Sequence, residues 1–259
     1  MNLMLTPQQI AHYKTFGFLF ISQAFSADEM EAITREAEAV WEEDREGQPV
    51  PEKGQHLTYF VEQRPALTKL VDDARILGTV ESLLGTDLIW VGSEGNFATN
   101  EEHGWRSDRK YFRPEENSLI DYPQIKMMMY LDSVTRDTGC LRVIPGSHRM
   151  PMHKELGIQE TGSRSNPFSL EGPDLPCCTL ESKPGDLAFF NHCLFHAIFG
   201  GWGGRRYIAI KYAVPPSTTE EIESLQRYTT NIFEPHEALL NNECPRIREL
   251  VKDLVGMKP

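Results

Sequence analysis

The sequence predicts a mainly β core with flanking helices, and two observations favour this fold class. Between residues 88 and 214 the chain consists of short segments rich in aromatic and β-branched residues, separated by Gly, Pro and Asp turns. On both sides of this part, apolar residues recur at helical spacing. With 259 residues and 40% hydrophobic composition, the chain can bury one substantial core. We therefore expect a single domain over residues 1–259.

The N-terminal part, about residues 1–86, is expected to be mainly helical. Two helix starts carry capping boxes, in which a Ser or Thr cap and a Gln or Glu three residues later satisfy two backbone donors. The pairs are Thr6 with Gln9 and Ser26 with Glu29. Apolar spacing extends the second helix to about Gly47 and places a third from Ala66 to Leu84, with a short apolar segment at 18–21 between the first two.

The β core is expected over about residues 87–215. Five segments have the composition of strands, at residues 88–98, 125–134, 140–144, 186–190 and 206–214. Helical propensity returns at 217–227 and near 236–255, so C-terminal helices over about 216–259 should pack outside the sheets. The polar stretch 149–176 is unusually long for a loop, which predicts either a lid over the site or an insertion without a role.

Composition excludes several classes of partner. A formal net charge of −12 and a pI near 5.2 argue against nucleic acid and favour a small-molecule substrate. The N-terminus lacks the charged and then apolar build of a signal peptide, and no apolar run approaches the roughly 20 residues that span a bilayer. The five cysteines form no CxxC or paired spacing. We expect a cytoplasmic protein with no membrane segment, and its oligomeric state is not readable.

Three segments carry the chemistry, in the order 104–112 (GWRSDRKYF), 125–149 (IKMMMYLDSVTRDTGCLRVIPGSHR) and 183–212 (KPGDLAFFNHCLFHAIFGGWGGRRYIAIKY). Together they resemble the phytanoyl-CoA dioxygenase family, which has a Trp-His-x-Asp element, a Leu-Asp, Gly-Cys-Leu and Pro-Gly-Ser-His block, and a Gly-Asp, His and Arg block in this order. The resemblance implies a double-stranded β-helix core, also called a jelly roll and cupin-like. It also implies an oxygenase that uses Fe(II), 2-oxoglutarate and dioxygen to oxidise a C–H bond of a small molecule.

Such a site needs two histidines and one carboxylate on one face of Fe(II), with three positions open for the oxo acid and dioxygen. The first histidine and the carboxylate are two residues apart, because alternate residues of a strand share a face. The resemblance gives the carboxylate role to Asp108 and the distal histidine role to His196. His192 is a rival, and on a regular strand it would share the face of His196 and support it.

The resemblance also predicts an arginine for the distal carboxylate of 2-oxoglutarate. Arg206 fits best, because strand parity places it on the same face as Ile208 and Ile210, whereas Arg205 is interpreted as a surface charge. Lys126 alternates with apolar residues on a core strand, so it is a candidate partner for a carboxylate of cofactor or substrate, or else a lysine that reaches solvent from a strand end. Asn96 and Trp105 are candidates for pocket lining.

One position departs from the family pattern. Arg106 stands where the first histidine is expected, and a guanidinium has no lone pair with which to bind iron. It is expected to pair with Asp108 in the metal's place. His103 could substitute only through a bulge, because its parity on a regular strand is wrong. Halogenation, in which the carboxylate is the missing ligand, is not implied because Asp108 is kept.

Four interpretations remain open for this departure. The chain is an oxygenase with impaired or absent iron binding, or a non-catalytic relative that binds a small acid or a partner subunit through Arg106. It is otherwise a metal-independent enzyme in which Arg106 polarises a substrate oxygen, or a structural protein with no ligand. Substrate identity cannot be read from one sequence.

Overall fold

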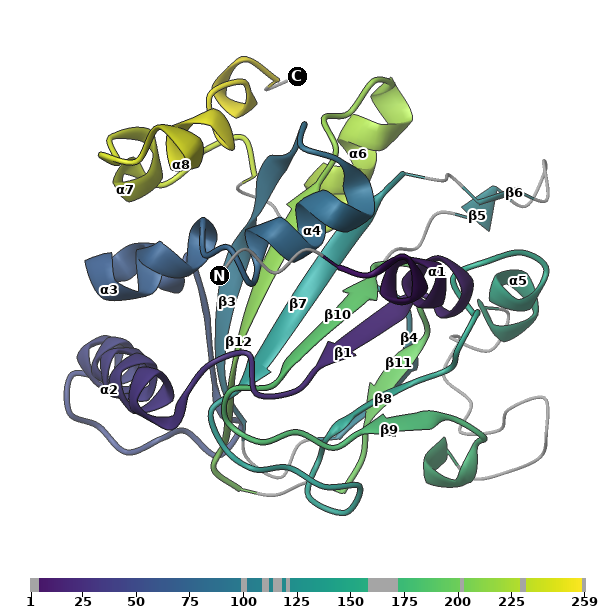
Figure 1. The fold of residues 1–259 in the computed structure, drawn as a ribbon. Coiled ribbons are helices and arrows are strands. Elements are labelled where there is room, and N and C mark those ends of the chain that lie inside the picture. Colours follow the sequence, from purple (N-terminus) through teal and green to yellow (C-terminus); the bar gives the residue numbers. More distant parts are fainter. Residues whose placement is uncertain are drawn as a thin grey trace.

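A computed structural model describes residues 5–98, 102–108, 112–113, 118–119, 122–157, 172–200, 203–228 and 232–257. Two antiparallel sheets face each other, and helices cover the outer side of the larger sheet (Figure 1). This is the cupin-like jelly roll that the resemblance implied. Within the described ranges, no helix is long and apolar enough to cross a membrane.

The larger sheet has six strands in the order β1-β10-β7-β12-β3-β2. Their bounds are β1 Phe18–Ile21, β10 Leu187–Asn191, β7 Gln124–Tyr130, β12 Arg205–Ala213, β3 Ile89–Ala98 and β2 Gln55–Thr58. The short apolar segment after the first helix is thus a strand, and it ties the N-terminal part to the core through its pairing with β10. Strand β2 was not predicted, because its four residues QHLT show no clear apolar alternation.

The smaller sheet has the order β4-β11-β8-β9. Its strands are β4 His103–Arg106, β11 His196–Ile198, β8 Leu141–Val143 and β9 Cys178–Leu180, and a separate pair is formed by β5 Phe112–Arg113 and β6 Ser118–Leu119. An apolar cluster between the two sheets joins Tyr207 and Ala209 of β12 to Leu141 and Val143 of β8. The inner face of β12 is therefore the face of its odd-numbered residues.

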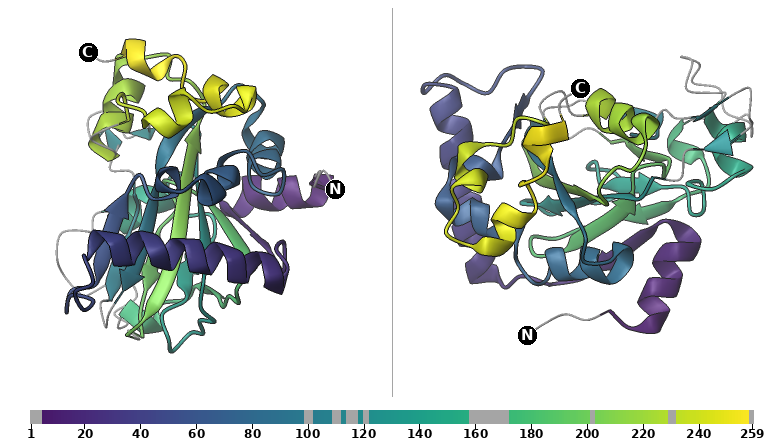
Figure 2. Two further views of the ribbon diagram at one scale, coloured as in Figure 1. Left: turned by 90° about the vertical axis from the view of Figure 1, so that its left-hand side faces the viewer. Right: turned by 90° about the horizontal axis from the view of Figure 1, so that it is seen from above.

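The outer face of the larger sheet is more apolar than the inner face. Ile208, Ile210 and Tyr212 of β12 belong to the cluster that also contains Met30 and Trp41. The last two residues come from the helix α2 (Ala27–Asp44), which crosses the strands in Figure 2. Burial of this face against helices explains why apolar residues alternate so clearly along β12.

The first two helices begin as predicted. Helix α1 (Pro7–Phe16) has Thr6 as its N-cap and Pro7 at its first position, and both hydrogen bonds of the box with Gln9 are present. Helix α2 has the same box between Ser26 and Glu29. The local sequence thus fixes where both helices start.

The predicted third helix is wrong as a continuous element. The chain forms η1 (Val61–Gln63), α3 (Pro65–Thr68) and η2 (Lys69–Val71), and after a turn it forms α4 (Leu77–Leu84). In the turn, Asp73 accepts hydrogen bonds from the backbone N–H and the Nε–H of Arg75, each at 2.9 Å. This local bonding competes with helical hydrogen bonds and ends the helix.

The C-terminal prediction needs a similar correction. Helix α6 (Thr219–Tyr228) is present, but residues 236–255 form the short helices α7 (Glu237–Leu240) and α8 (Pro245–Glu249), followed by η4 (Leu254–Met257). Pro245 starts α8 because it has no N–H to continue the preceding helix.

The polar stretch 149–176, predicted to be a lid or an insertion, contains helix α5 (Met152–Gly157) and η3 (Gly172–Asp174). Most of the remainder, residues 158–171, lies outside the described residues, so the structure does not test the lid.

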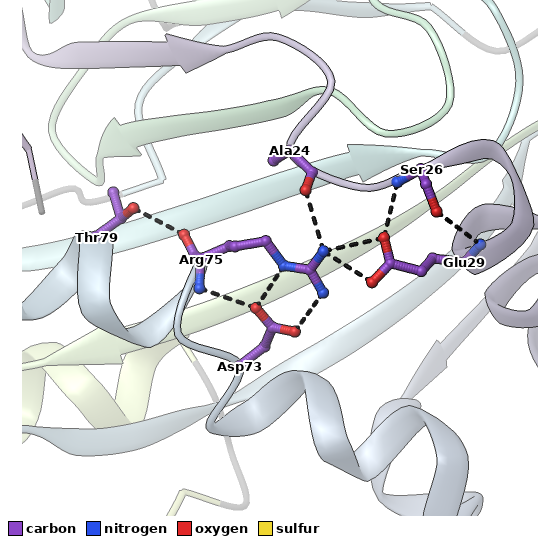
Figure 3. Close-up of polar contacts among 6 residues, drawn as sticks. All are labelled: Ala24, Ser26, Glu29, Asp73, Arg75 and Thr79. Carbon is purple, nitrogen blue, oxygen red and sulfur yellow. Dashed lines mark hydrogen bonds and ion pairs between the residues drawn. The ribbon is translucent and has the colours of Figure 1, made fainter. Parts of the chain in front are cut away.

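Arg75 ties the turn before α4 to the start of α2 (Figure 3). Its guanidinium donates to Asp73 Oδ2 at 2.7 Å, to Glu29 Oε1 at 2.8 Å and to the Ala24 carbonyl at 3.1 Å. It also lies over the ring of Phe25, with Cζ 3.6 Å from the ring centroid. One cation therefore satisfies acceptors from two segments and adds a cation–π contact.

The Arg75→Met variant is expected to lose about 2 kcal/mol of unfolding free energy, because it leaves two carboxylates without their shared cation. Urea denaturation measures this loss. Lys252→Met is the matched control, since it breaks only an exposed pair with Glu249, and it should leave the unfolding free energy nearly unchanged. Equal losses in the two variants would contradict the role of Arg75.

The same network predicts the pH dependence of stability. The hydrogen bond from the Ser26 backbone, followed by that from Arg75, lowers the pKa of Glu29 below its ordinary 4.5. This contribution to stability is complete above pH 4.5 and is lost as the pH falls through the lowered pKa. The difference in unfolding free energy between the wild type and Arg75→Met should therefore shrink in acid. A difference that grew in acid would contradict this assignment.

Candidate active site

A carboxylate and an imidazole meet between the sheets. Asp108 follows β4, and His196 begins β11 with 1% of its surface exposed. The Nε2 atom of His196 lies 3.4 Å from Oδ1 of Asp108. The Nδ1 atom lies 2.9 Å from the Leu194 carbonyl, and if Nδ1 carries the proton and donates it there, Nε2 presents a lone pair to the carboxylate.

This pair fits a metal ion. Two ligands that bind a first-row metal at about 2.1 Å and at right angles lie about 3 Å apart, which is close to the observed 3.4 Å. Nε2 of His196 has no hydrogen-bond partner among the described residues, although it is buried. A cation between the two groups would satisfy both lone pairs. Asp108 and His196 therefore fit two of the three protein ligands of a facial triad.

The third position does not fit. Arg106 pairs with His196 in the β4–β11 ladder, so both side chains project from the same face of the smaller sheet. The described residues contain no group of three His, Cys, Asp or Glu side chains that could hold a metal. The ladder shifts register between His196 and Ile198, so an irregularity of the kind that His103 required is present, and His103 pairs with Ile198. Even so, His103 joins no group of three possible ligands among the described residues.

The expected ion pair between Arg106 and Asp108 is not formed. Asp108 instead has Lys126, whose Nζ lies 3.4 Å from its Oδ2. In the part of the chain that the structure describes, Arg106 makes no hydrogen bond or ion pair, although its charge acts on the hydroxyl of Tyr207. The reason for the difference is that Lys126 reaches the carboxylate from β7, on the opposite sheet.

Lys126 belongs to a buried chain of charges. It is 7% exposed, which excludes the alternative of a lysine that reaches solvent. Its Nζ also lies 3.4 Å from Glu94 Oε2, and Glu94 forms a second ion pair with Lys211. Burial raises the pKa of Asp108 and of Glu94, but the adjacent cations lower both, that of Asp108 well below its usual value and that of Glu94 to about 2. Both carboxylates are thus held ionised.

Arg206 does not reach the site. Its guanidinium donates to both carboxylate oxygens of Asp132, at 3.0 Å and 2.6 Å, and also pairs with Glu38 of α2. It shares a face with Ile208 and Ile210, as predicted, but that face is the outer one, which the helices cover. The prediction that Arg206 binds the distal carboxylate of 2-oxoglutarate is therefore wrong, because its side chain lies on the outer face of the sheet.

Arg205 takes the inward position instead. Its side chain is fully buried, and Nε and both terminal nitrogens have no hydrogen-bond partner among the described residues. A Cβ at Gly139 would lie 1.9 Å from one terminal nitrogen, so the glycine makes room for the guanidinium. Burial raises the pKa of Tyr130, and the nearby charge of Arg205 opposes that rise. The interpretation of Arg205 as a surface charge is wrong.

The remaining candidates take supporting positions. His192 lies in the turn after β10 and not on β11, but its charge helps to lower the pKa of Asp108. Asn96 Oδ1 lies 2.8 Å from Nδ1 of His56. Trp105 donates from Nε1 to the Gly172 carbonyl at 2.8 Å, which fixes the end of the polar stretch against β4.

Comparisons with known sequences find a matching family and named relatives. The family model described as Phytanoyl-CoA dioxygenase (PhyH) matches residues 13–199. A protein named ectoine dioxygenase from Bordetella bronchiseptica is 24% identical over 215 residues, which cover 74% of this chain and 69% of the relative. An ectoine dioxygenase from Sphingopyxis alaskensis is 25% identical over 222 residues, which cover 76% of this chain and 71% of that relative.

Solved structures share the fold. HygX from Streptomyces hygroscopicus, solved with nickel and 2-oxoglutarate bound, superposes with a TM-score of 0.65 at 18% identity and covers 81% of this chain and 87% of its own. The non-heme alpha ketoglutarate dependent carbocyclase SnoK from nogalamycin biosynthesis superposes with a TM-score of 0.59 at 18% identity, covering 81% and 84%.

Proposed function

The chain belongs to the phytanoyl-CoA dioxygenase family, and from this premise we propose that it oxidises a small-molecule metabolite at an iron site weakened by Arg106. Its enzyme class is that of the 2-oxoglutarate-dependent dioxygenases, with Fe(II) and 2-oxoglutarate as cofactors. The observation that carries the proposal is the buried pair of Asp108 and His196, set 3.4 Å apart. When bound, the two cofactors activate dioxygen for oxidation of a substrate C–H bond.

Arg205 supports a 2-oxoglutarate pocket between the sheets. A buried guanidinium without partners is costly, and a carboxylate can accept two parallel hydrogen bonds from it. The distal carboxylate of 2-oxoglutarate is such a group. We therefore assign the role that the sequence had given to Arg206 to Arg205.

Lys126 and Arg106 both act against metal binding. Arg106 stands where one of the three protein ligands would be. Lys126 forms an ion pair with Asp108 and so competes with a metal ion for this carboxylate. Loss of partners that only orient metal ligands typically weakens binding by about 10- to 100-fold, so loss of a ligand should cost at least about 100-fold. We expect iron to bind through Asp108 and His196 with correspondingly low affinity.

Turnover tests the proposal. Succinate formation from 2-oxoglutarate is measured with saturating Fe(II) and with candidate substrates, of which ectoine is the first because the curated relatives are named for it. We expect slow formation of succinate that stops when a chelator is added. Product formed equally with chelator present would favour a metal-independent enzyme, and a silent protein even with histidine at position 106 would contradict the proposal.

The Gly139→Ala variant tests the Arg205 pocket. The added Cβ displaces the guanidinium, so we expect the 2-oxoglutarate affinity to fall about tenfold, together with a stability loss of about 1–2 kcal/mol from the positive φ of 89°. Gly47→Ala is the control, because Gly47 has φ 76° but nothing lies within 4 Å of its Cβ. It should lose similar stability and keep its affinity. Equal affinities for the two variants would argue against the pocket.

A further inference from the structure

We propose that this pocket binds a dicarboxylate without a metal, with Arg205 holding one carboxylate and Arg106 the other. The inference rests on the proposed function for the position of the cofactor pocket at Arg205. It goes further, because it gives Arg106 a binding role in place of the missing histidine.

Both guanidinium groups are available for an anion. Arg205 is fully buried, and its three side-chain nitrogens have no partner among the described residues. Arg106 shares the face of His196 and makes no hydrogen bond or ion pair within the described ranges. Arg205 shares the inner face of β12 with Tyr207. Burial raises the pKa of the Tyr207 hydroxyl, and the charges of Arg205 and Arg106 are among those that oppose the rise.

The neighbouring carboxylates are already neutralised. Asp108 forms an ion pair with Lys126, and Glu94 forms ion pairs with Lys211 and Lys126. Among the described residues, these ion pairs join two carboxylates to two lysines, and neither Arg106 nor Arg205 takes part in them. A dicarboxylate offers one carboxylate to the buried guanidinium of Arg205 and a second to that of Arg106 in a single molecule.

This binding mode predicts an unusual ligand preference. A metal recognises 2-oxoglutarate through its 2-oxo group and the adjacent carboxylate, so a metal-dependent site rejects glutarate, which lacks the oxo group. Two guanidinium groups recognise only the two carboxylates. Without metal, therefore, the protein should bind glutarate about as tightly as 2-oxoglutarate.

Isothermal titration calorimetry of the full chain with excess EDTA tests the proposal, using 2-oxoglutarate and glutarate as probes. We expect both to bind, with dissociation constants within about threefold of each other, since the oxo group makes no charged contact. The Arg106→Leu variant should bind both about tenfold or more weakly, which corresponds to the loss of a charge-assisted pair. The control Lys252→Met removes an exposed positive charge and should bind like the wild type.

Three results would overturn the inference. The first is 2-oxoglutarate binding that requires Fe(II) and excludes glutarate, which would leave the proposed oxygenase function standing. The second is metal-free binding that is unchanged in Arg106→Leu. The third is no binding of either probe with or without Fe(II), which would remove the proposed function as well.

Discussion

The Arg106→His variant is expected to bind Fe(II) about 100-fold more tightly than the wild type and to convert 2-oxoglutarate to succinate at a readily measured rate. Position 106 faces His196 across the β4–β11 ladder, and Asp108 already lies 3.4 Å from His196. A histidine there would place a third lone pair on the same face. The substitution also removes a positive charge that repels the metal.

Anaerobic Fe(II) titration and a succinate assay measure the two effects. Arg106→Leu separates the contributions, because it removes the charge but supplies no ligand. We expect it to recover only a small part of the iron affinity and no turnover. Equal gains in Arg106→Leu and Arg106→His would show that position 106 repels the metal but is not a ligand position.

The Arg205→Met variant is expected to lose at least about 100-fold in 2-oxoglutarate affinity, whereas the adjacent Arg206→Met keeps it. Methionine retains the unbranched stem of Arg205 but offers nothing to a carboxylate. The guanidinium of Arg206 already forms ion pairs with Asp132 and Glu38, on the other face of β12. Adjacent residues of a strand face opposite sides, so the two variants form a matched pair.

Arg206→Met is expected to lower stability, since it leaves the partly buried Asp132 without its cation. Binding should therefore be measured at a temperature at which circular dichroism shows both variants to be folded. Loss of affinity in Arg206→Met but not in Arg205→Met would reverse the assignment of the two arginines.

The parts of the fold that the sequence predicts well depend on local signals. The boxes at Thr6 and Ser26 fix two helix starts within a few residues, and the structure places both helices there. The third helix was predicted as continuous because its apolar spacing runs through Asp73, where side-chain bonds to Arg75 form a turn. Apolar spacing cannot show that competition, because it depends on the hydrogen bonds that polar side chains make with the nearby backbone.

The sequence predicted only part of the site, because spacing along a strand does not show which of its faces looks inward. The family resemblance assigned roles to Asp108 and His196, and the structure brings these two side chains together. Arg206 was chosen because it shares a face with isoleucines, on the assumption that an apolar face looks into the pocket. In this fold the apolar face of β12 looks toward the helices, and the face with Arg205 and Lys211 looks toward the smaller sheet. Arg205 and Lys211 lie an even number of residues apart on β12, and this spacing was the signal that could have shown that they share the inner face.

Lys126 shows what the sequence could not decide. Its alternation with Met128 and Tyr130 indicated an inward side chain, but its partner depended on which strands face β7. The structure supplies Asp108 from the opposite sheet and Glu94 from the same sheet. Neither contact can be read from spacing, because each joins segments far apart in the chain.

The most direct test of a preserved cofactor pocket around a two-ligand metal site uses the unmodified protein. Equimolar Fe(II) and excess 2-oxoglutarate are added without oxygen, and calorimetry and the visible spectrum are recorded on the same sample. The visible charge-transfer band forms only when the oxo acid chelates bound Fe(II). We predict that 2-oxoglutarate binds and that no such band develops. A band of full intensity would contradict the account, because it would require a third ligand that replaces Arg106.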